Sequence, residues 1–223
     1  MVTMSVRAVV VCAIFAAAWW QPQVSAATLG VDVAGAVSKD TWDCLAKAGR
    51  SFAIVRAWHS YGEFDSDSVN TIKSAWSAGM RHVDVYLFPC PSKSAAAQVN
   101  GTYHNLDTNK VKFGMMWFDI EINPSDGCHW SSDLSRNCKY MSELIAAAEA
   151  VGNPWGIYSS HYEWENVMGL DCTVGKNFQL WDAHYDGKPT GDFVPYAGWT
   201  KAAMKQYSGT SKLCDREIDL DAY

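Results

Sequence analysis

The sequence predicts an α/β protein, a TIM-like (β/α) barrel with about eight strands, about five helices and a degraded last third. Apolar segments of strand length alternate with helical segments, which is typical of a parallel sheet covered by helices. The same junction also occurs three times, because a glycine suited to end a helix precedes a buried strand at Gly49, Gly79 and Gly152. A doubly wound open sheet is the alternative, but no glycine-rich phosphate loop follows the first expected strand.

The first third contains two strand–helix units. Residues 29–33 are a short apolar strand, and Ser38 is suited to cap a helix that runs to Gly49. Residues 52–57 are the second apolar strand. A helix over residues 66–79 follows, because a serine opens it and its apolar side chains recur at helical spacing.

The middle of the chain repeats this order. A strand at 82–88 precedes a helix at 93–103, and a strand at 114–121 precedes a helix at 137–151 that ends at a glycine. Residues 155–159 form the fifth strand. Each strand is apolar and short, as expected for strands buried on both faces.

The last third keeps strands but lacks long helices between them. Its strands are expected at residues 179–183, 202–207 and 217–220. The count then reaches eight, so the sheet can close into a barrel. In such a barrel the first and last strands are neighbours, and functional residues lie at the carboxyl ends of the strands.

Four acidic residues lie at such strand ends. Asp119 and Glu121 end the fourth strand two positions apart, so their side chains point the same way, about 7 Å apart along the backbone. Asp32 ends the first strand and Asp219 lies in the last, so barrel closure should bring them together. Two acids on one face at the end of a buried strand are costly, and the common use of such a pair is acid/base chemistry. The alternative for this motif is a strand end that simply emerges into solvent.

Aromatic residues lie at other strand ends. Tyr86, Tyr158 and Trp181 are suited to stack on the apolar faces of sugar rings, whereas most other tryptophans are expected in the core. Glu163 and Glu165 follow the fifth strand and either rim the cleft or are solvated charges, and the solvated interpretation is favoured. The histidines have no ligand spacing, so neither a metal nor a cofactor is expected.

The N-terminal 26 residues resemble a secretory signal. An apolar run follows Arg7, and the small residues of Val24-Ser25-Ala26 suit a cleavage site. We therefore expect a signal peptide at 1–26, a single domain at 27–223 and a secreted product in the extracellular space, a gut lumen or a lysosome-like vesicle. The chain has a formal net charge of −6, so nucleic-acid binding is not expected. We also expect no membrane attachment after signal removal, and a monomer.

Six cysteines remain beyond the signal, which favours three disulfides in a secreted protein. The expected pairs are Cys128–Cys138, because the segment between them is polar and loop-like, and then Cys172–Cys214 and Cys44–Cys90. Asn100 begins an Asn-Gly-Thr acceptor for N-glycosylation.

The chain resembles glycoside hydrolase family 25, the lysozyme family that contains the Chalaropsis-type muramidases, and within it the eukaryotic, protist-like branch. The resemblance spans most of residues 28–223 and is carried, in order, by Gly30-Val31-Asp32-Val33, Tyr86-Leu87-Phe88, Asp119-Ile120-Glu121, Ile157-Tyr158-Ser159, Leu180-Trp181-Asp182-Ala183-His184-Tyr185, Gln206-Tyr207 and Ile218-Asp219-Leu220. Two places depart from the family pattern: the segment that begins at Arg56, and Lys205 where a tryptophan is common.

The resemblance implies a hydrolase that cleaves the β-1,4 bond between N-acetylmuramic acid and N-acetylglucosamine in bacterial peptidoglycan, for defence or digestion. Glu121 would be the general acid, Asp119 would steady the charged intermediate, and Asp32 and Asp219 would position substrate or water. The implied substrate-binding residues are Tyr86, Tyr158, Trp181, Arg56 and Gln206. Attack by the substrate acetamido group and attack by water both remain open.

Two other readings remain. One is a catalytically silent glycan-binding protein on the same fold. The other is a chitinase-like hydrolase, which shares the Asp-x-Glu motif but usually has a further aspartate where this chain has Trp117.

Overall fold

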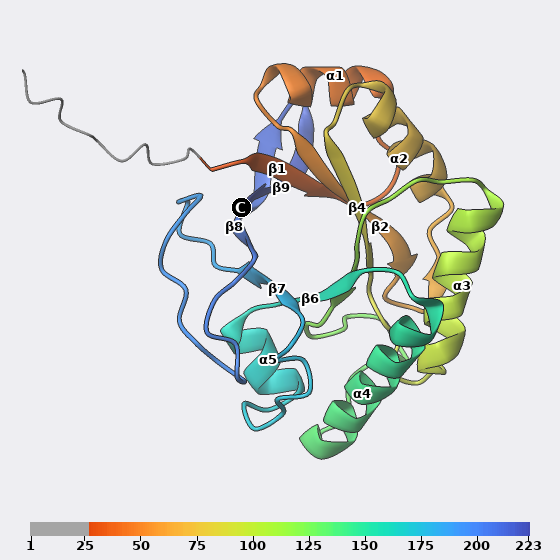
Figure 1. The fold of residues 1–223 in the computed structure, drawn as a ribbon, viewed down its shortest axis with the longest axis vertical. Coiled ribbons are helices and arrows are strands. Elements are labelled where there is room, and N and C mark those ends of the chain that lie inside the picture. Colours follow the sequence, from red (N-terminus) through yellow and green to blue (C-terminus); the bar gives the residue numbers. More distant parts are fainter. Residues whose placement is uncertain (1–26) are drawn as a thin grey trace, which may run out of the picture.

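The computed structural model describes residues 27–223, which form a closed barrel of strands with helices outside it (Figure 1). The strands are β1 (Leu29–Val33), β2 (Phe52–His59), β3 (Glu63–Phe64), β4 (His82–Leu87), β5 (Met116–Asp119), β6 (Trp155–Ser159), β7 (Gln179–Ala183), β8 (Met204–Leu213) and β9 (Arg216–Ala222). The helices are α1 (Lys39–Lys47), α2 (Asp67–Ser77), α3 (Ala95–Thr108), α4 (Leu134–Val151) and α5 (His161–Val167). The ring runs β1-β9-β8-β7-β6-β5-β4-β2 and closes through β1 and β2, while β3 pairs only with β2.

The predicted barrel with about eight strands and five helices is confirmed for the described residues. Adjacent strands from β1 through β2, β4, β5, β6, β7 and β8 are parallel, whereas β9 runs antiparallel to both of its neighbours. The helices follow one another round the ring from α1 at the top to α5 at the bottom of Figure 1, and the long loop that connects β7 to β8 lies at the left. The degraded last third therefore ends in a β8–β9 hairpin that needs no crossover helix.

The apolar residues form two layers. Inside the barrel, Trp117 and Trp181 pack edge to face with their ring centroids 5.9 Å apart. Between the barrel and its helices, the predicted core residue Trp42 is fully buried, and its indole N–H donates to the Thr71 carbonyl at 3.1 Å. This bond matters because a buried indole N–H without a partner would destabilise the fold.

Three disulfides form, as predicted from the cysteine count, but all three predicted pairings are wrong. The observed pairs are Cys44–Cys214, Cys90–Cys128 and Cys138–Cys172. Helix α4 begins earlier than expected because Asp133 caps it, with its side chain accepting from the amides of Ser135 and Arg136. Cys138 therefore lies in the second turn of α4 instead of at its start, and it pairs with Cys172 in the segment after α5. Cys128 stays in the loop before α4 and pairs with Cys90 after β4.

The structure leaves the predicted signal peptide and the predicted glycosylation site untested. The expected signal peptide at 1–26 lies outside the described residues. Within residues 27–223, no helix is both long enough and apolar enough to span a bilayer. Asn100 is exposed on α3, while Thr102 of the same acceptor is buried and donates to the Gln98 carbonyl at 2.8 Å.

Candidate active site

The four predicted acids meet in one cavity of about 250 Å³ at the carboxyl ends of the parallel strands. Its lining residues are Asp32, Tyr86, Asp119, Glu121, Tyr158, Trp181, Tyr185, Gln206 and Asp219. Larger cavities lie elsewhere: one of about 820 Å³ lies between α4 and the segment after α5, and none of these acids lines it. The candidate active site is therefore the smaller cavity, because it contains the four acids.

Asp119 and Glu121 share a face of one chain segment, as predicted. Asp119 is the last residue of β5 and is 6% exposed, while Glu121 lies two residues beyond the strand. The Oδ1 atom of Asp119 is buried and has no hydrogen-bond partner among the described residues. Since a buried acceptor without a partner is costly, this oxygen is well placed to accept a hydrogen bond from a bound molecule.

Asp32 and Asp219 are brought together by barrel closure, because they are directly opposite each other in the β1–β9 register. Gln206 on β8 lies between them, and its Nε2 donates to Asp32 Oδ2 at 2.6 Å and to Asp219 Oδ2 at 3.5 Å. The hydroxyls of Tyr158 and Tyr185 donate to Gln206 Oε1 at 2.8 and 2.7 Å. These two donors fix the amide so that its N–H groups face the carboxyl groups.

Burial and mutual repulsion raise the proton affinity of these acids. Burial, followed by the negative charge of Asp219, raises the pKa of Asp32 to about 8. Burial, followed by the charges of Glu163 and Asp219, raises the pKa of Glu121 to about 7. The pKa of Asp119 is raised well above its ordinary value, first by burial and then by the charges of Glu121 and Asp32. Groups that hold protons near neutral pH are suited to acid catalysis.

A fifth acid, Asp221, was not predicted as part of the site. It is fully buried on β9, accepts from the Trp181 indole N–H at 2.9 Å and contacts the Asp32 carboxyl group. Burial and the charge of Asp32 raise its pKa, and two carboxyl groups in contact need a shared proton. The alternation along β9 was the available signal, because Asp219 and Asp221 are two positions apart and so share a face.

The predicted substrate-binding residues are placed in different ways. Tyr86, Tyr158, Trp181 and Gln206 line the cavity, but Trp181 is only 2% exposed. Arg56 does not line it, because its guanidinium is paired with Asp65 at 2.9 Å, so its contact with substrate remains a prediction. Tyr185 also lines the cavity and is 61% exposed at its rim, but it was not predicted from the sequence as a substrate-binding residue.

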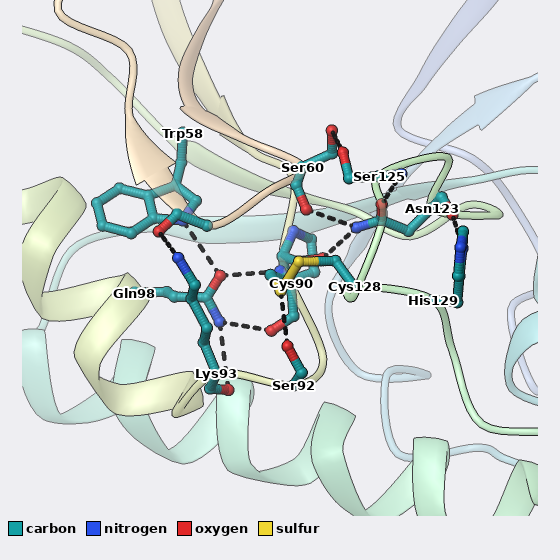
Figure 2. Close-up of a disulfide and its surroundings, with 12 residues drawn as sticks. Trp58, Ser60, Cys90, Ser92, Lys93, Gln98, Asn123, Ser125, Cys128 and His129 are labelled. Atoms are coloured by element: carbon teal, nitrogen blue, oxygen red, sulfur yellow. Dashed lines mark hydrogen bonds between the residues drawn. A yellow bond between two sulfur atoms is a disulfide. The ribbon is translucent and has the colours of Figure 1, made fainter.

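The chain after β5 is anchored on several sides. Figure 2 shows the Cys90–Cys128 disulfide beside Asn123, whose Nδ2 donates to the Ser60 carbonyl at 2.8 Å and to the Pro89 carbonyl at 3.0 Å. The Trp130 indole N–H donates to the Glu121 carbonyl at 2.8 Å. Glu121 thus lies on a braced segment rather than on a free loop. Within residues 27–223, no group of three or more potential ligand side chains has the arrangement of a metal site.

Comparison with known proteins gives consistent results. A family model described as "Lysozyme-like protein 1" matches residues 23–207. The "Probable GH family 25 lysozyme 2" of Dictyostelium discoideum is 38% identical over 203 residues, which cover 90% of this chain and 93% of that protein. The chain belongs to glycoside hydrolase family 25.

Solved structures share the family 25 fold at lower identity. A family GH25 lysozyme from Aspergillus fumigatus superposes with a TM-score of 0.71 at 19% identity, covering 89% of this chain and 94% of that one. The modular autolysin LytC from Streptococcus pneumoniae, solved with a synthetic peptidoglycan ligand, gives a TM-score of 0.70 at 15% identity. The match covers 88% of this chain but 46% of LytC. At these identities, the similarity to solved structures shows that the barrel fold is shared.

Proposed function

We propose that this family 25 protein is a lysozyme that hydrolyses the β-1,4 bond between N-acetylmuramic acid and N-acetylglucosamine in bacterial peptidoglycan. The observation that carries the proposal is the cavity in which Asp32, Asp119, Glu121 and Asp219 meet at the barrel mouth. The lysozyme and muramidase names of its relatives, and the peptidoglycan ligand of LytC, support peptidoglycan as the substrate class.

In this proposal Glu121 is the general acid. Its pKa of about 7 keeps its proton available in mildly acidic and neutral solution. The proton passes to the glycosidic oxygen as the bond to the sugar breaks, and a positively charged, oxocarbenium-like centre develops. The carboxyl oxygens around the cavity favour that centre, because electron-rich oxygens in a water-poor cavity stabilise developing positive charge.

Asp119 has a separate role in the proposal. Its partner-free Oδ1 would accept a hydrogen bond from the acetamido N–H of the bound sugar. Gln206 would hold Asp32 and Asp219 in position, while the exposed ring of Tyr185 would stack on a sugar at the rim.

We also propose secretion, with cleavage of residues 1–26. Three disulfides in residues 27–223 support it, because such bonds persist in oxidising compartments.

The change Glu121→Gln tests the acid role, since glutamine keeps the shape of the side chain but has no proton to transfer. We expect lysis of purified peptidoglycan to fall by at least about 10²-fold, the scale of losing a general acid. Turbidity clearing measures the rate, and mass analysis of the new reducing ends identifies the cleaved bond. Glu149→Gln on the exposed face of α4 is the matched control.

The outcomes separate the alternatives. Reducing-end muramic acid supports the lysozyme, whereas N-acetylglucosamine ends would indicate a chitinase-like hydrolase. Binding without cleavage by the unaltered protein would indicate a silent glycan-binding protein. Near-normal lysis by a folded Glu121→Gln protein would remove Glu121 from the acid role.

A further inference from the structure

Glu163, in the first turn of α5, reaches across to the Glu121 segment. Its Oε2 accepts a hydrogen bond at 2.8 Å from the amide N–H of Ile122, the residue directly after Glu121. Glu163 was expected to be a solvated charge, but it is only partly exposed and is bound to the neighbouring strand end. This is a correction to the sequence-based expectation.

The local sequence makes this contact unusual. Ser160 caps α5 by accepting from the Glu163 amide at 3.0 Å, and a serine followed three residues later by a glutamate is the pattern of a capping box. In that motif the glutamate returns to the amide of the capping residue. Here Glu163 instead bonds Ile122, so the helix start is linked to the segment that carries Glu121.

The ends of β5 and β6 are joined by two further bonds. The Ile120 amide donates to the Tyr158 carbonyl at 2.9 Å, and the Ser159 hydroxyl donates to the Ile120 carbonyl at 2.7 Å. These two bonds hold Ile120, the residue before Glu121, and the Glu163 bond holds Ile122, the residue after it. The backbone on both sides of Glu121 is therefore fixed by the β6–α5 segment.

We propose that Glu163 is a positioning residue for the reaction: it holds the backbone beyond Glu121 and places a negative charge next to the Glu121 carboxyl group from outside the cavity. Among the charges that act on Glu121, that of Glu163 has the largest effect, followed by that of Asp219, and both raise the pKa of Glu121. A neighbour of this kind extends the pH range over which the acid keeps its proton.

Other ionisable groups also surround Glu121 and must be kept constant in any test. Six of them line the cavity with Glu121: Asp32 on β1, Tyr86 on β4, Asp119 on β5, Tyr158 on β6, Tyr185 after β7 and Asp219 on β9. Arg56 on β2 does not line the cavity, but its charge acts on Asp119. On α5 itself, His161 and Glu165 are exposed, and the Nδ1 atom of His161 lies 3.8 Å from the Oε2 atom of Glu165.

Glu163→Gln and Glu165→Gln form a matched pair. Both remove one negative charge from α5, but Glu163→Gln keeps a side-chain oxygen that can accept from Ile122, and Glu165 has no contact with the Glu121 segment in the described residues. With Glu163→Gln the alkaline midpoint of the lysis profile should move down by about 0.2 to 0.7 pH units, the scale of one partly screened charge pair. With Glu165→Gln it should move much less.

Glu163→Ala adds a test of the backbone contact. It removes both the charge and the acceptor, so the rate at acidic pH should fall, whereas Glu163→Gln should keep that rate. Equal rates for the two variants at acidic pH would overturn the positioning part of the proposal. Equal shifts for Glu163→Gln and Glu165→Gln would overturn the charge part.

This role presupposes the acid role proposed for Glu121, so a second measurement is independent of lysis. NMR titration of the carboxyl carbons in the folded protein gives the pH midpoint at which the Glu121 carboxyl group loses its proton. The Glu121 signal is assigned by its absence in Glu121→Gln. A lower midpoint in Glu163→Gln than in Glu165→Gln supports the proposal even if the protein does not cleave peptidoglycan. An unchanged Glu121 midpoint refutes the charge part of the proposal even if the protein is an active lysozyme.

Discussion

At the scale of single residues, the Gln206 amide is held in one orientation by two tyrosines. The hydroxyls of Tyr158 and Tyr185 both donate to Oε1, which leaves Nε2 facing Asp32 and Asp219. Either hydroxyl alone supports this orientation, because a rotated amide would turn its carbonyl oxygen toward the oxygens of Asp32 and Asp219 and would lose the O–H donor at Oε1. The two tyrosines should therefore act as a partly redundant pair.

We expect Tyr158→Phe and Tyr185→Phe each to lower kcat/KM on peptidoglycan fragments by less than about tenfold, the scale of one neutral hydrogen bond. The double variant should lose more than the product of the two single losses, because the amide is then free to rotate. Tyr196→Phe is the control, since that hydroxyl donates to Asp182 and lies outside the cavity. A double variant whose loss equals the product would show that the tyrosines act independently.

At the scale of elements, the disulfides connect segments that local pattern does not relate. Cys44 in α1 is joined to Cys214 in the β8–β9 turn across 170 residues, with their Cα atoms 5.9 Å apart. The bond attaches the final hairpin to the first helix. It therefore supports the closure between β9 and β1 that places Asp219 opposite Asp32.

Mass mapping without reduction should find the peptides Cys44–Cys214, Cys90–Cys128 and Cys138–Cys172, and no alkylated cysteine in residues 27–223. Replacing both Cys44 and Cys214 by alanine should lower the free energy of unfolding by about 2–5 kcal/mol, as measured by urea denaturation. The same double change at Cys138 and Cys172 is the comparison, because that bond closes a loop of 34 residues. A Cys128–Cys138 peptide would contradict this map.

At the scale of the whole molecule, barrel closure creates the field at the site. Asp219 comes from the last strand, yet its negative charge acts on both Glu121 and Asp32 and raises the pKa of each. An open sheet would leave β9 without β1 and would separate these groups. The proton on Glu121 is therefore a property of the closed ring.

We expect Asp219→Asn to move the alkaline limb of the lysis profile to lower pH. The acid works when protonated, so activity falls as pH rises through its pKa of about 7, and removing a nearby negative charge lowers that pKa. Asp215→Asn in the exposed β8–β9 turn is the control, with an unchanged limb expected. An upward shift with Asp219→Asn would mean that Asp219 does not act on Glu121 through its charge.

The sequence by itself determined the elements and most of the acids. Strand and helix positions follow from apolar periodicity and caps, which are local properties, so β1, β6 and β7 begin and end at the predicted residues. The predicted carboxylates Asp119 and Glu121 share a face because they are two positions apart at a strand end. The six cysteines likewise indicated three bonds.

Only the tertiary structure decided the partners. The cystine pairs, the antiparallel pairing of β9 with β1 and the bond from Glu163 to Ile122 each join segments far apart in the chain. Periodicity carries no information about the geometry of such distant contacts. Asp221 is part of the site because closure buries it against Asp32; alternation along β9 indicates the face on which Asp221 lies but not this contact. Local forces set each element, whereas the closed packing of the barrel set the environment that gives these carboxyl groups their proton affinity.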